Sequence, residues 1–427
     1  MDTFRENEPV ITNWLQDNAI PIQHLEAGNG FTNLQPLKHI FDDVRIVGLG
    51  EATHGTHEFF QLKHRLLEFL VTEMGFTMFA VESSYAACQP INEYVLHDNG
   101  DRDAVLVGQH YVAWDTEEFS ALLDWLRAYN RNVPDDRKVR FYGLDITYNE
   151  NGRQAVLEYL NQVDPDKVGP TASLFQVLAR EEAKWPMRID KESEATTKRT
   201  VPLLQDLIAY MTEHRDTLVG RSSRAAFERT LRFVQIMEQW GSSGNAGRSQ
   251  HMAGNLLHLI DRDSTGTKAV YWGHNFHVGV EASPDGGQTF GHVLRQRFGD
   301  AYFALALEFG QGSFQTRAVQ PDGVMGDLKE ETLGPPLAGS LPWHLSRAGI
   351  DAFVVSLRTP TSDPIIEQWL AATLAAHAIG WASGDPASAY EPRAIGTAYD
   401  GIAFVQQATA TRPTATALKI VERRKEF

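Results

Sequence analysis

Short apolar segments alternate with amphipathic stretches along much of this chain, and this alternation constrains its fold more than any other feature. The segments rich in β-branched, aromatic and aliphatic residues are 44–49, 77–81, 139–144, 268–272, 302–307, 352–357 and 401–405. Between them, residues 58–73 and 119–129 repeat apolar side chains at helical spacing. Strands that alternate with helices predict an α/β fold, with a mostly parallel central sheet covered by helices on both faces.

A middle region interrupts this alternation. Residues 165–247 contain no convincing strand, and their apolar residues repeat at helical spacing over 173–185, 200–218 and 223–240. One predicted apolar stripe comprises Leu203, Leu204, Leu207, Ile208 and Met211. We therefore expect an α/β core formed by residues 1–164 and 248–427, with residues 165–247 inserted as a helical subdomain. That subdomain would either lie over an active-site cleft or simply pack as core helices, and the glycine-rich segment 241–247 would join it to the sheet.

Charge and cysteine content exclude several classes of function. The chain has 39 Lys and Arg against 55 Asp and Glu, a formal net charge of −16, which disfavours nucleic acids and anionic membranes as partners. The single cysteine, Cys88, cannot form an internal disulfide or a cysteine zinc cluster. The charged N-terminus does not resemble a signal peptide, and no run of about 18 apolar residues is present. We expect a cytoplasmic globular protein, and the sequence predicts no particular oligomeric state.

Polar residues follow the predicted strands. Glu51 and His54 follow the first, Glu82 the second, Asp145 the third, His274-Asn275-Phe276-His277 the fourth, and Glu308 lies near the end of the fifth. Ligands of parallel α/β sheets bind beyond the carboxyl ends of the strands, so these residues are expected at one edge. Each residue taken singly is better explained by capping or a turn. Together they predict a functional cleft.

Glu51 and His54 form the tightest pair in this set. A neutral imidazole can take a proton from water, while an adjacent carboxylate orients the ring and stabilises the imidazolium that forms. Gly48, Gly50 and Gly55 are interpreted as permitting a sharp chain reversal in this loop.

Other catalytic signatures are absent from the sequence. There is no G-x-S-x-G and no phosphate-binding G-x-x-x-x-G-K-[ST], and the glycines before Glu51 place a carboxylate where a dinucleotide's pyrophosphate would bind. His57-Glu58 is not completed to H-E-x-x-H, and Cys88 is interpreted as core packing. Three hypotheses stay open: a hydrolase without a metal or other cofactor, which we favour, a metal-dependent hydrolase or peptidase, and a non-catalytic binder of a hydrophobic small molecule. The metal ligands of the second hypothesis would be Glu51, His54, Glu82, His274 and His277.

Several segments resemble the erythromycin esterase family. They are VGLGEATHGTHEFFQLKHRLLEFLVTEMGF, VESS, WDTEEFSALLDWLRAYN, YGLDI and GHNFHVG, in order between Arg45 and Gly310, with a weaker likeness over Tyr399–Pro413. The resemblance implies an α/β core with a helical subdomain around a deep cleft. It also implies metal-independent hydrolysis of a macrolide lactone, an activity that confers antibiotic resistance.

Matching the family motifs residue by residue assigns roles to particular side chains. His54 would be the general base beside Glu51, Glu82 the strand-end glutamate, His274 the second catalytic histidine, and His277 its neighbour. Lys63 stands where some esterases carry arginine, and Arg248-Ser249 stands where the family often shows Arg-Asp. Because lysine cannot make the planar bidentate contact of a guanidinium, these departures bear on macrolide specificity more than on hydrolysis.

The resulting hypothesis is an ester or lactone hydrolase acting on a small molecule. His54 deprotonates water, and His274, with Lys63 or Arg248, stabilises the oxyanion. The predicted substrate-binding residues are Lys63, His277, Asn275, Arg248, Trp114 and Tyr111. Trp114 and Tyr111 would line an apolar wall, although a core role is equally compatible with their positions. His57, His64 and Glu58 are expected to be structural.

Overall fold

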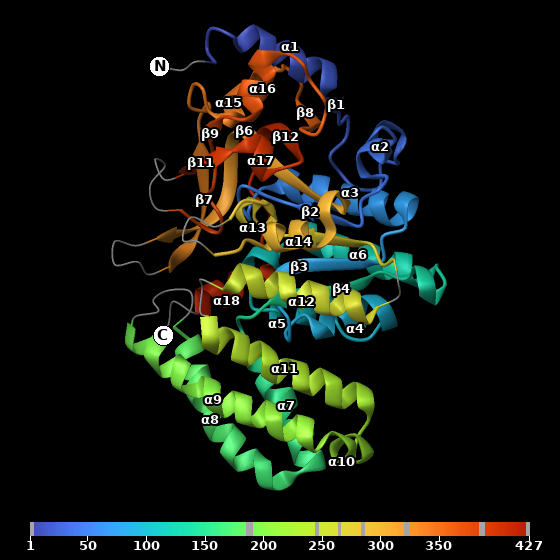
Figure 1. Cartoon of the computed structure of the whole chain (residues 1–427), viewed down its shortest axis with the longest axis vertical. Coiled ribbons are helices and arrows are strands. Elements are labelled where there is room, and N and C mark those ends of the chain that lie inside the picture. The colour runs from blue at the N-terminus through green and yellow to red at the C-terminus, as the bar shows by residue number, and fades with distance from the viewer. Residues whose placement is uncertain are drawn as a thin grey trace.

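The structure is a computed structural model that describes residues 4–184, 191–243, 247–263, 266–282, 287–319, 325–383 and 389–423. Its centre is a twisted sheet that is mixed but mostly parallel, as Figure 1 shows. Within the described residues this sheet has ten strands, and eight of them follow the order β1-β8-β12-β6-β2-β5-β3-β4. The remaining two, β7 and β10, pair with β6. The predicted fold class is confirmed in this coarse form.

The strands fall into a parallel centre and antiparallel margins. Neighbours from β12 to β4 are parallel, whereas β1 and β12 run antiparallel to β8, and β7 runs antiparallel to β6. The strand bounds are β1 Ile20–Pro21, β2 Ile46–Leu49, β3 Met78–Ser84, β4 Arg140–Asp145, β5 Ala269–Trp272, β6 Tyr302–Val319, β7 Met325–Leu333, β8 Ala352–Ser356, β10 Ala382–Ser383 and β12 Gly401–Ala408. A separate hairpin consists of β9 Thr373–His377 and β11 Tyr390–Ala394. Each strand predicted from the sequence is present.

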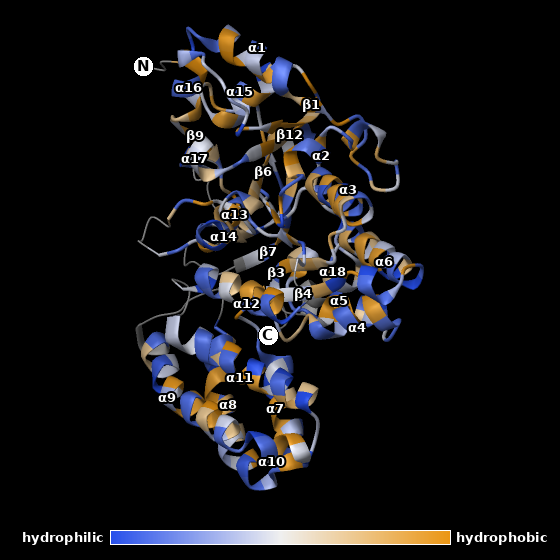
Figure 2. Cartoon of the chain, turned by 45° about the vertical axis from the view of Figure 1, so that its right-hand side comes forward, coloured by the Kyte–Doolittle hydropathy of each residue, from blue (hydrophilic) through white to orange (hydrophobic). Residues whose placement is uncertain are grey.

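Helices cover both faces of the sheet. Alternate residues of β2 and β3 enter two different hydrophobic clusters, with Val47 and Phe79 in one and Ile46 and Met78 in the other. The first cluster includes α2 Leu37–Phe41, α3 His57–Met74, α4 Gln89–His97, α5 Arg102–Gly108 and α6 Glu117–Arg131. The second includes α1 Glu8–Asn18, α12 Arg248–Arg262, α14 Phe290–Phe298, α15 Leu341–Arg347, α16 Pro364–Leu370 and α17 Ile395–Ala398. Apolar stripes alternate with polar faces on α4 and α6 in Figure 2, as expected for helices packed on a sheet.

The middle of the chain forms a helical region at the lower end of the molecule in Figure 1. It comprises α7 Glu150–Val163, α8 Val168–Glu182, α9 Lys191–Glu213, α10 Arg215–Gly220 and α11 Arg224–Ser243. These helices share one hydrophobic cluster with Tyr85, Ala86 and Ile146, which follow β3 and β4. The helical region therefore begins at α7, earlier than residue 165, and packs against the carboxyl ends of β3 and β4.

The structure differs in two details from the helical region predicted from the sequence. Leu203 is 53% exposed, whereas Leu204 and Met211 are fully buried, so Leu203 does not belong to the apolar stripe. A helix turns 100° per residue, and the position next to a buried residue can already face solvent. The predicted glycine-rich joint begins inside α11, because Gly241 and Ser243 are helical, and residues 244–246 lie outside the described residues.

β6 is much longer than predicted. It continues to Val319, so Glu308 lies in the middle of the strand and not near its end. The extension is possible because β12 stays paired with β6 as far as Gly312, and β7 pairs antiparallel with the part beyond. No helix in the described part of the chain combines the length and apolar character needed to span a membrane.

Candidate active site

The predicted catalytic residues meet at the carboxyl edge of the sheet. Glu51 and His54 follow β2, Glu82 lies near the end of β3, Asp145 ends β4, and His274 follows β5. The main-chain N–H of His274 donates to Glu82 Oε2 at 2.9 Å, and the His54 and His274 ring centroids are 5.4 Å apart. Residues from four strands, far apart in the sequence, therefore form one cluster.

The Glu51 carboxylate is fully buried and is surrounded by three donors. Oε1 lies 2.6 Å from His54 Nδ1, while Oε2 accepts from Lys63 Nζ at 2.7 Å and from Trp272 Nε1 at 2.9 Å. Burial lowers the pKa of Lys63 to about 8, and the charge of Glu51 opposes that shift. The cost of burying this carboxylate is offset because each of its oxygen atoms has a hydrogen-bond or ion-pair partner.

His54 is oriented by this carboxylate. Its Nδ1 faces Glu51, and no hydrogen bond within the described residues engages Nε2. The side chain is 11% exposed, and its ring packs edge-on against Trp114. Burial disfavours the imidazolium, but the hydrogen bond to Glu51 and the charges of Glu82 and Glu51 outweigh burial, so the pKa of His54 is raised above 6.5.

His274 differs from His54 in its charge and in its partners. Burial, together with the nearby His54 and His277, lowers its pKa to about 3, so the ring is neutral near pH 7. Nδ1 accepts from the main-chain N–H of Phe276 at 3.2 Å, which leaves Nε2–H to donate to Ala52 O at 3.2 Å. His274 is therefore a neutral hydrogen-bond donor and His54 the more basic imidazole.

Glu82 and Asp145 share the guanidinium of Arg248, the first residue of α12. Arg248 Nη2 lies 2.9 Å from Glu82 Oε1, and Nε lies 3.0 Å from both carboxylate oxygens of Asp145. His277 Nε2 is 3.2 Å from Glu82 Oε1, and its Nδ1 is 2.9 Å from Ser249 Oγ. Burial would raise the pKa of Glu82, but His277 and Arg248 outweigh it and hold that pKa well below 4.5.

These groups leave the cluster one negative charge in excess. The carboxylates Glu51, Glu82 and Asp145 face two cations, Lys63 and Arg248. Before any of the three histidines His54, His274 and His277 takes up a proton, three negative and two positive charges leave a net charge of −1. A proton arriving on His54 cancels that charge, so the cluster favours formation of the imidazolium.

The predicted substrate-binding residues occupy different settings. Lys63 is fully buried beneath Glu51, and its ammonium lies 4.6 Å from the Trp272 ring centroid. Trp114 is buried in the core, and its indole N–H donates to Glu82 O at 3.0 Å. The Asn275 side-chain amide donates to Leu307 O and accepts from Leu307 N, both at 3.0 Å. These two hydrogen bonds hold α13 (Asn275–Val278) against β6.

Tyr111 lies beside Asp145 and is only half-buried. Its hydroxyl bonds Asp145 and Thr147, and its ring packs edge-on against Tyr148. His110 and Tyr148 both have positive φ, at 70° and 53°. Left-handed backbone is unfavourable for such side chains, and it occurs here in the residue before Tyr111 and in the residue that the Tyr111 ring contacts.

The glycines around His54 are needed for a reason other than the predicted chain reversal. None of Gly48, Gly50 and Gly55 has a positive φ. A β-carbon at Gly50 would lie 2.2 Å from Asn275 Oδ1, and one at Gly55 would lie 1.8 Å from Gln315 O. Glycine is required because neighbouring groups approach the backbone closely.

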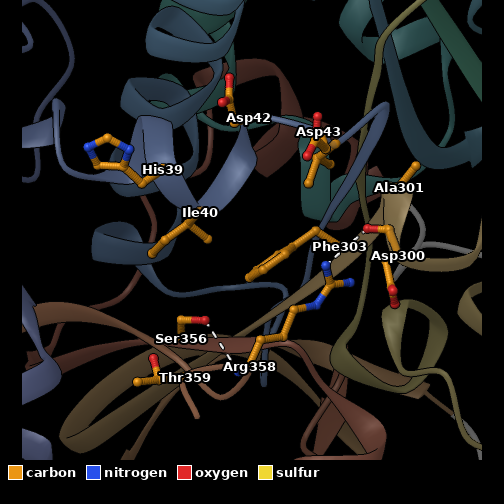
Figure 3. Close-up of a pocket in the computed structure, with 11 residues that line it drawn as sticks. His39, Ile40, Asp42, Asp43, Asp300, Ala301, Phe303, Ser356, Arg358 and Thr359 are labelled. Carbon is orange, nitrogen blue, oxygen red and sulfur yellow. Dashed lines mark hydrogen bonds between the residues drawn. The ribbon is translucent and has the colours of Figure 1, made fainter.

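Two further findings concern metals and cavities. Among the residues that the structure describes, no three His, Cys, Asp or Glu side chains are arranged to hold a metal ion. A cavity of about 540 Å³ lies at the opposite edge of the sheet, shown in Figure 3, and is lined by His39, Asp42, Asp300, Phe303 and Arg358 among others. It contains none of the predicted site residues, and Arg358 Nε is already bonded to Asp400.

Contacts from distant parts of the chain also support the His54 loop, and the sequence did not indicate them. Ala52 O accepts from Ile379 N and Gly380 N at 2.9 and 3.1 Å, and Gly55 O accepts from Thr411 N at 2.9 Å. A Glu308–His377 pair lies near the first of these contacts. Main-chain contacts leave no side-chain pattern in the sequence, so only the structure reveals them.

A mostly parallel sheet with an oriented histidine–carboxylate pair at its carboxyl edge defines an α/β protein with the side chains of a hydrolase. The chain belongs to the erythromycin esterase family, because the family model described as "Erythromycin esterase" matches residues 71–408. Glu82 and His274 fall inside that match, whereas Glu51, His54 and Lys63 precede it. Erythromycin esterase type II of Escherichia coli is 25% identical over 396 residues, covering 82% of this chain and 89% of that protein.

Solved structures show the same fold. A Bacillus cereus protein superposes with a TM-score of 0.79 at 24% identity, covering 96% of this chain and 99% of the other. A mutant erythromycin esterase in its open conformation superposes with a TM-score of 0.65 at 17% identity, covering 89% of this chain and 94% of the other. The family and the fold are thus established together: this chain is a hydrolase of the erythromycin esterase family.

Proposed function

We propose that this protein hydrolyses a small-molecule ester or lactone, with His54 as the general base. The observation that carries the proposal is the Glu51–His54 contact of 2.6 Å, which leaves His54 Nε2 without a partner in the described residues. Nε2 takes a proton from water, and the resulting hydroxide attacks the acyl carbon to give a tetrahedral oxyanion. The cluster's single excess negative charge favours the imidazolium at that moment. Collapse of this intermediate breaks the bond between the acyl carbon and the alkoxy oxygen, which leaves as the alcohol after it takes the proton from the His54 imidazolium.

His274 is proposed to stabilise the oxyanion that this attack creates. Its ring is neutral, and its Nε2–H makes a 3.2 Å hydrogen bond to Ala52 O. An oxyanion close to His54 would attract this donor more strongly than a carbonyl does, since charged acceptors form stronger hydrogen bonds. Loss of one preorganised oxyanion donor costs about 3–4 kcal/mol in the transition state, and the cost expected for His274 is smaller because its N–H must first leave Ala52 O.

Glu82 and Arg248 are proposed to fix the position of His274. Glu82 Oε2 fixes the main chain of His274, and Arg248 fixes Glu82 against Asp145. Lys63 is assigned to holding Glu51, since it is fully buried. His277, Tyr111 and Arg248 are the predicted substrate-binding residues that retain some exposure beside the cluster.

A substrate screen tests the proposal. Purified protein is incubated with macrolides, other lactones and aryl esters, and products that have gained one water molecule are detected by mass spectrometry. His54→Asn should lower kcat roughly a hundredfold or more for any substrate found. His64→Asn is the matched control, because His64 is a buried histidine on α3 whose pKa burial lowers to about 4.

The outcomes separate the hypotheses. Hydrolysis that needs His54 and persists after treatment with a chelator supports the proposal, whereas loss of activity on chelation supports a metal-dependent hydrolase. Near-normal turnover in His54→Asn contradicts the assignment of the base. Binding without turnover across the panel indicates a non-catalytic binder.

A further inference from the structure

A second buried histidine–carboxylate pair lies beside the candidate active site. Glu308 of β6 accepts from the main-chain N–H of His377 at 3.2 Å and lies 2.9 Å from His377 Nδ1. Both side chains are only 1% exposed. Two contacts from one carboxylate to one residue fix the main chain and the ring of His377 together.

Neighbouring side chains hold the His377 ring in its contact with Glu308. The ring stacks on Phe309 with centroids 4.4 Å apart and packs against Tyr390 at 4.6 Å. Nε2 is buried and has no hydrogen-bond partner within the described residues. A buried polar atom without a partner is unfavourable, so the geometry is maintained by the Glu308 side of the ring and by stacking.

His377 lies two residues before the segment that holds the His54 loop, residues 379–380. Ile379 N and Gly380 N both donate to Ala52 O, and Gly380 O accepts from His54 N at 3.1 Å. Gly380 has a φ of +64°, which turns its amide and its carbonyl toward the two sides of Thr53. The main chain on either side of Thr53, and so the start of the His54 side chain, is fixed by these contacts.

We propose that Glu308 and His377 are positioning residues for His54. They act through residues 379–380: Glu308 fixes His377, His377 fixes the turn at Gly380, and Gly380 fixes the main chain of His54 so that Nδ1 meets Glu51. This inference rests on the proposed role of His54, and it adds a part of the chain that no motif identifies. Small displacements of a catalytic group reduce turnover strongly, so such support has a kinetic effect.

The test measures the basicity of His54 directly. Full-length protein labelled with ¹⁵N-histidine is titrated by NMR, and the His54 signals are assigned from their absence in His54→Asn. Glu308→Gln should lower the pKa of His54, since a displaced loop weakens the contact with Glu51 that raises it. For a substrate found in the screen, kcat should fall about tenfold with little change in KM.

Three further variants make the result specific. Glu68→Gln is the matched control, because Glu68 is also buried but bonds Gly28 N, away from the site. His377→Asn, which keeps a donor near the position of Nδ1, should retain the wild-type pKa of His54, and His377→Leu should not. If Glu308→Gln does not fold, the comparison of His377→Asn with His377→Leu still decides whether this histidine positions His54.

An unchanged pKa and kcat in Glu308→Gln and His377→Leu would overturn the proposal. So would equal changes in Glu68→Gln, or a lower thermal midpoint as the sole effect of these substitutions. If the wild-type protein hydrolyses no compound, the proposed function fails, but the NMR titration still decides whether this pair positions His54.

Discussion

The ammonium of Lys63 lies 2.7 Å from Glu51 Oε2, and neither side chain is exposed to solvent. On the other side of the same carboxylate, Oε1 lies 2.6 Å from His54 Nδ1. The negative charge of Glu51 raises the pKa of His54, and the positive charge of Lys63 lowers it. The two residues thus adjust the basicity of His54 in opposite directions.

Replacement of Glu51 by glutamine should move the pH–rate profile to lower pH. The base must be neutral to accept a proton, so activity rises with pH through the pKa of His54, which Glu51 raises above 6.5. Without Glu51, burial dominates and that pKa falls. The rate at the plateau should also drop by roughly 10²–10⁴, because the ring loses its orienting partner. Measurements of kcat/KM from pH 4 to 9 check both effects, and an acidic limb that stays in place would contradict the assigned role.

Replacement of Lys63 by methionine should shift the acidic limb in the opposite direction. Removing its charge leaves Glu51 to raise the pKa of His54 unopposed, so the limb moves to higher pH. Removing one partner of a buried ion pair also costs about 3–5 kcal/mol of stability. Lys38→Met is the control, because its pair with Glu73 lies at the surface, where solvent screens the attraction and the contribution to stability is small. Thermal unfolding and pH–rate profiles of the two variants should differ accordingly.

Acid should remove a stabilising contribution from Glu82. Its pKa in the folded protein is well below 4.5, so its ionised form stabilises the fold above the unfolded-state value near 4.5. That contribution disappears as pH falls toward the folded-state pKa. The thermal midpoints of wild type and Glu82→Gln should therefore differ most near neutral pH and converge in acid. Midpoints that stay equally far apart from pH 7 to pH 3 would count against this linkage.

Alanine at Gly55 should damage the His54 loop although the backbone conformation there is ordinary. The new methyl group would lie 1.8 Å from Gln315 O, so either the loop or β6 must move. Such overpacking costs typically about 1–3 kcal/mol, and we expect turnover to fall more than tenfold. Gly169→Ala, on α8 with nothing within 4 Å of the new atom, serves as the comparison. Equal behaviour of the two variants in unfolding and in kinetics would show that the close approach is unimportant.

Much of the fold and the centre of the site can be predicted because their signals are local. Apolar runs such as Ile46–Leu49 mark buried parallel strands, and the polar residues after them share one edge by geometry alone. Glu51 and His54 are three residues apart, so their contact in the structure needs only one turn of chain. The cluster of Glu82 and His274 then follows from the order of parallel strands β2, β5 and β3.

The parts that could not be predicted depend on contacts between distant residues. Glu308 looks like a strand-end residue until β12 and β7 are seen to extend β6 beyond it. Lys63 looks like a substrate-binding cation, but its side chain points into the core toward Glu51. Whether a residue faces the core or the substrate is decided by tertiary packing, and spacing along the chain does not specify it.

Main-chain pairing of the His54 loop has a consequence for how the protein matures. Residues 52–57 bond to residues 379–380 and 409–411, which follow them by more than 300 positions in the sequence. An unfinished chain emerging from the ribosome can form β2 and α3, but its base has no fixed position. Because contacts so distant in sequence form late and slowly, the enzyme becomes competent only after residues 379–411 have been synthesised.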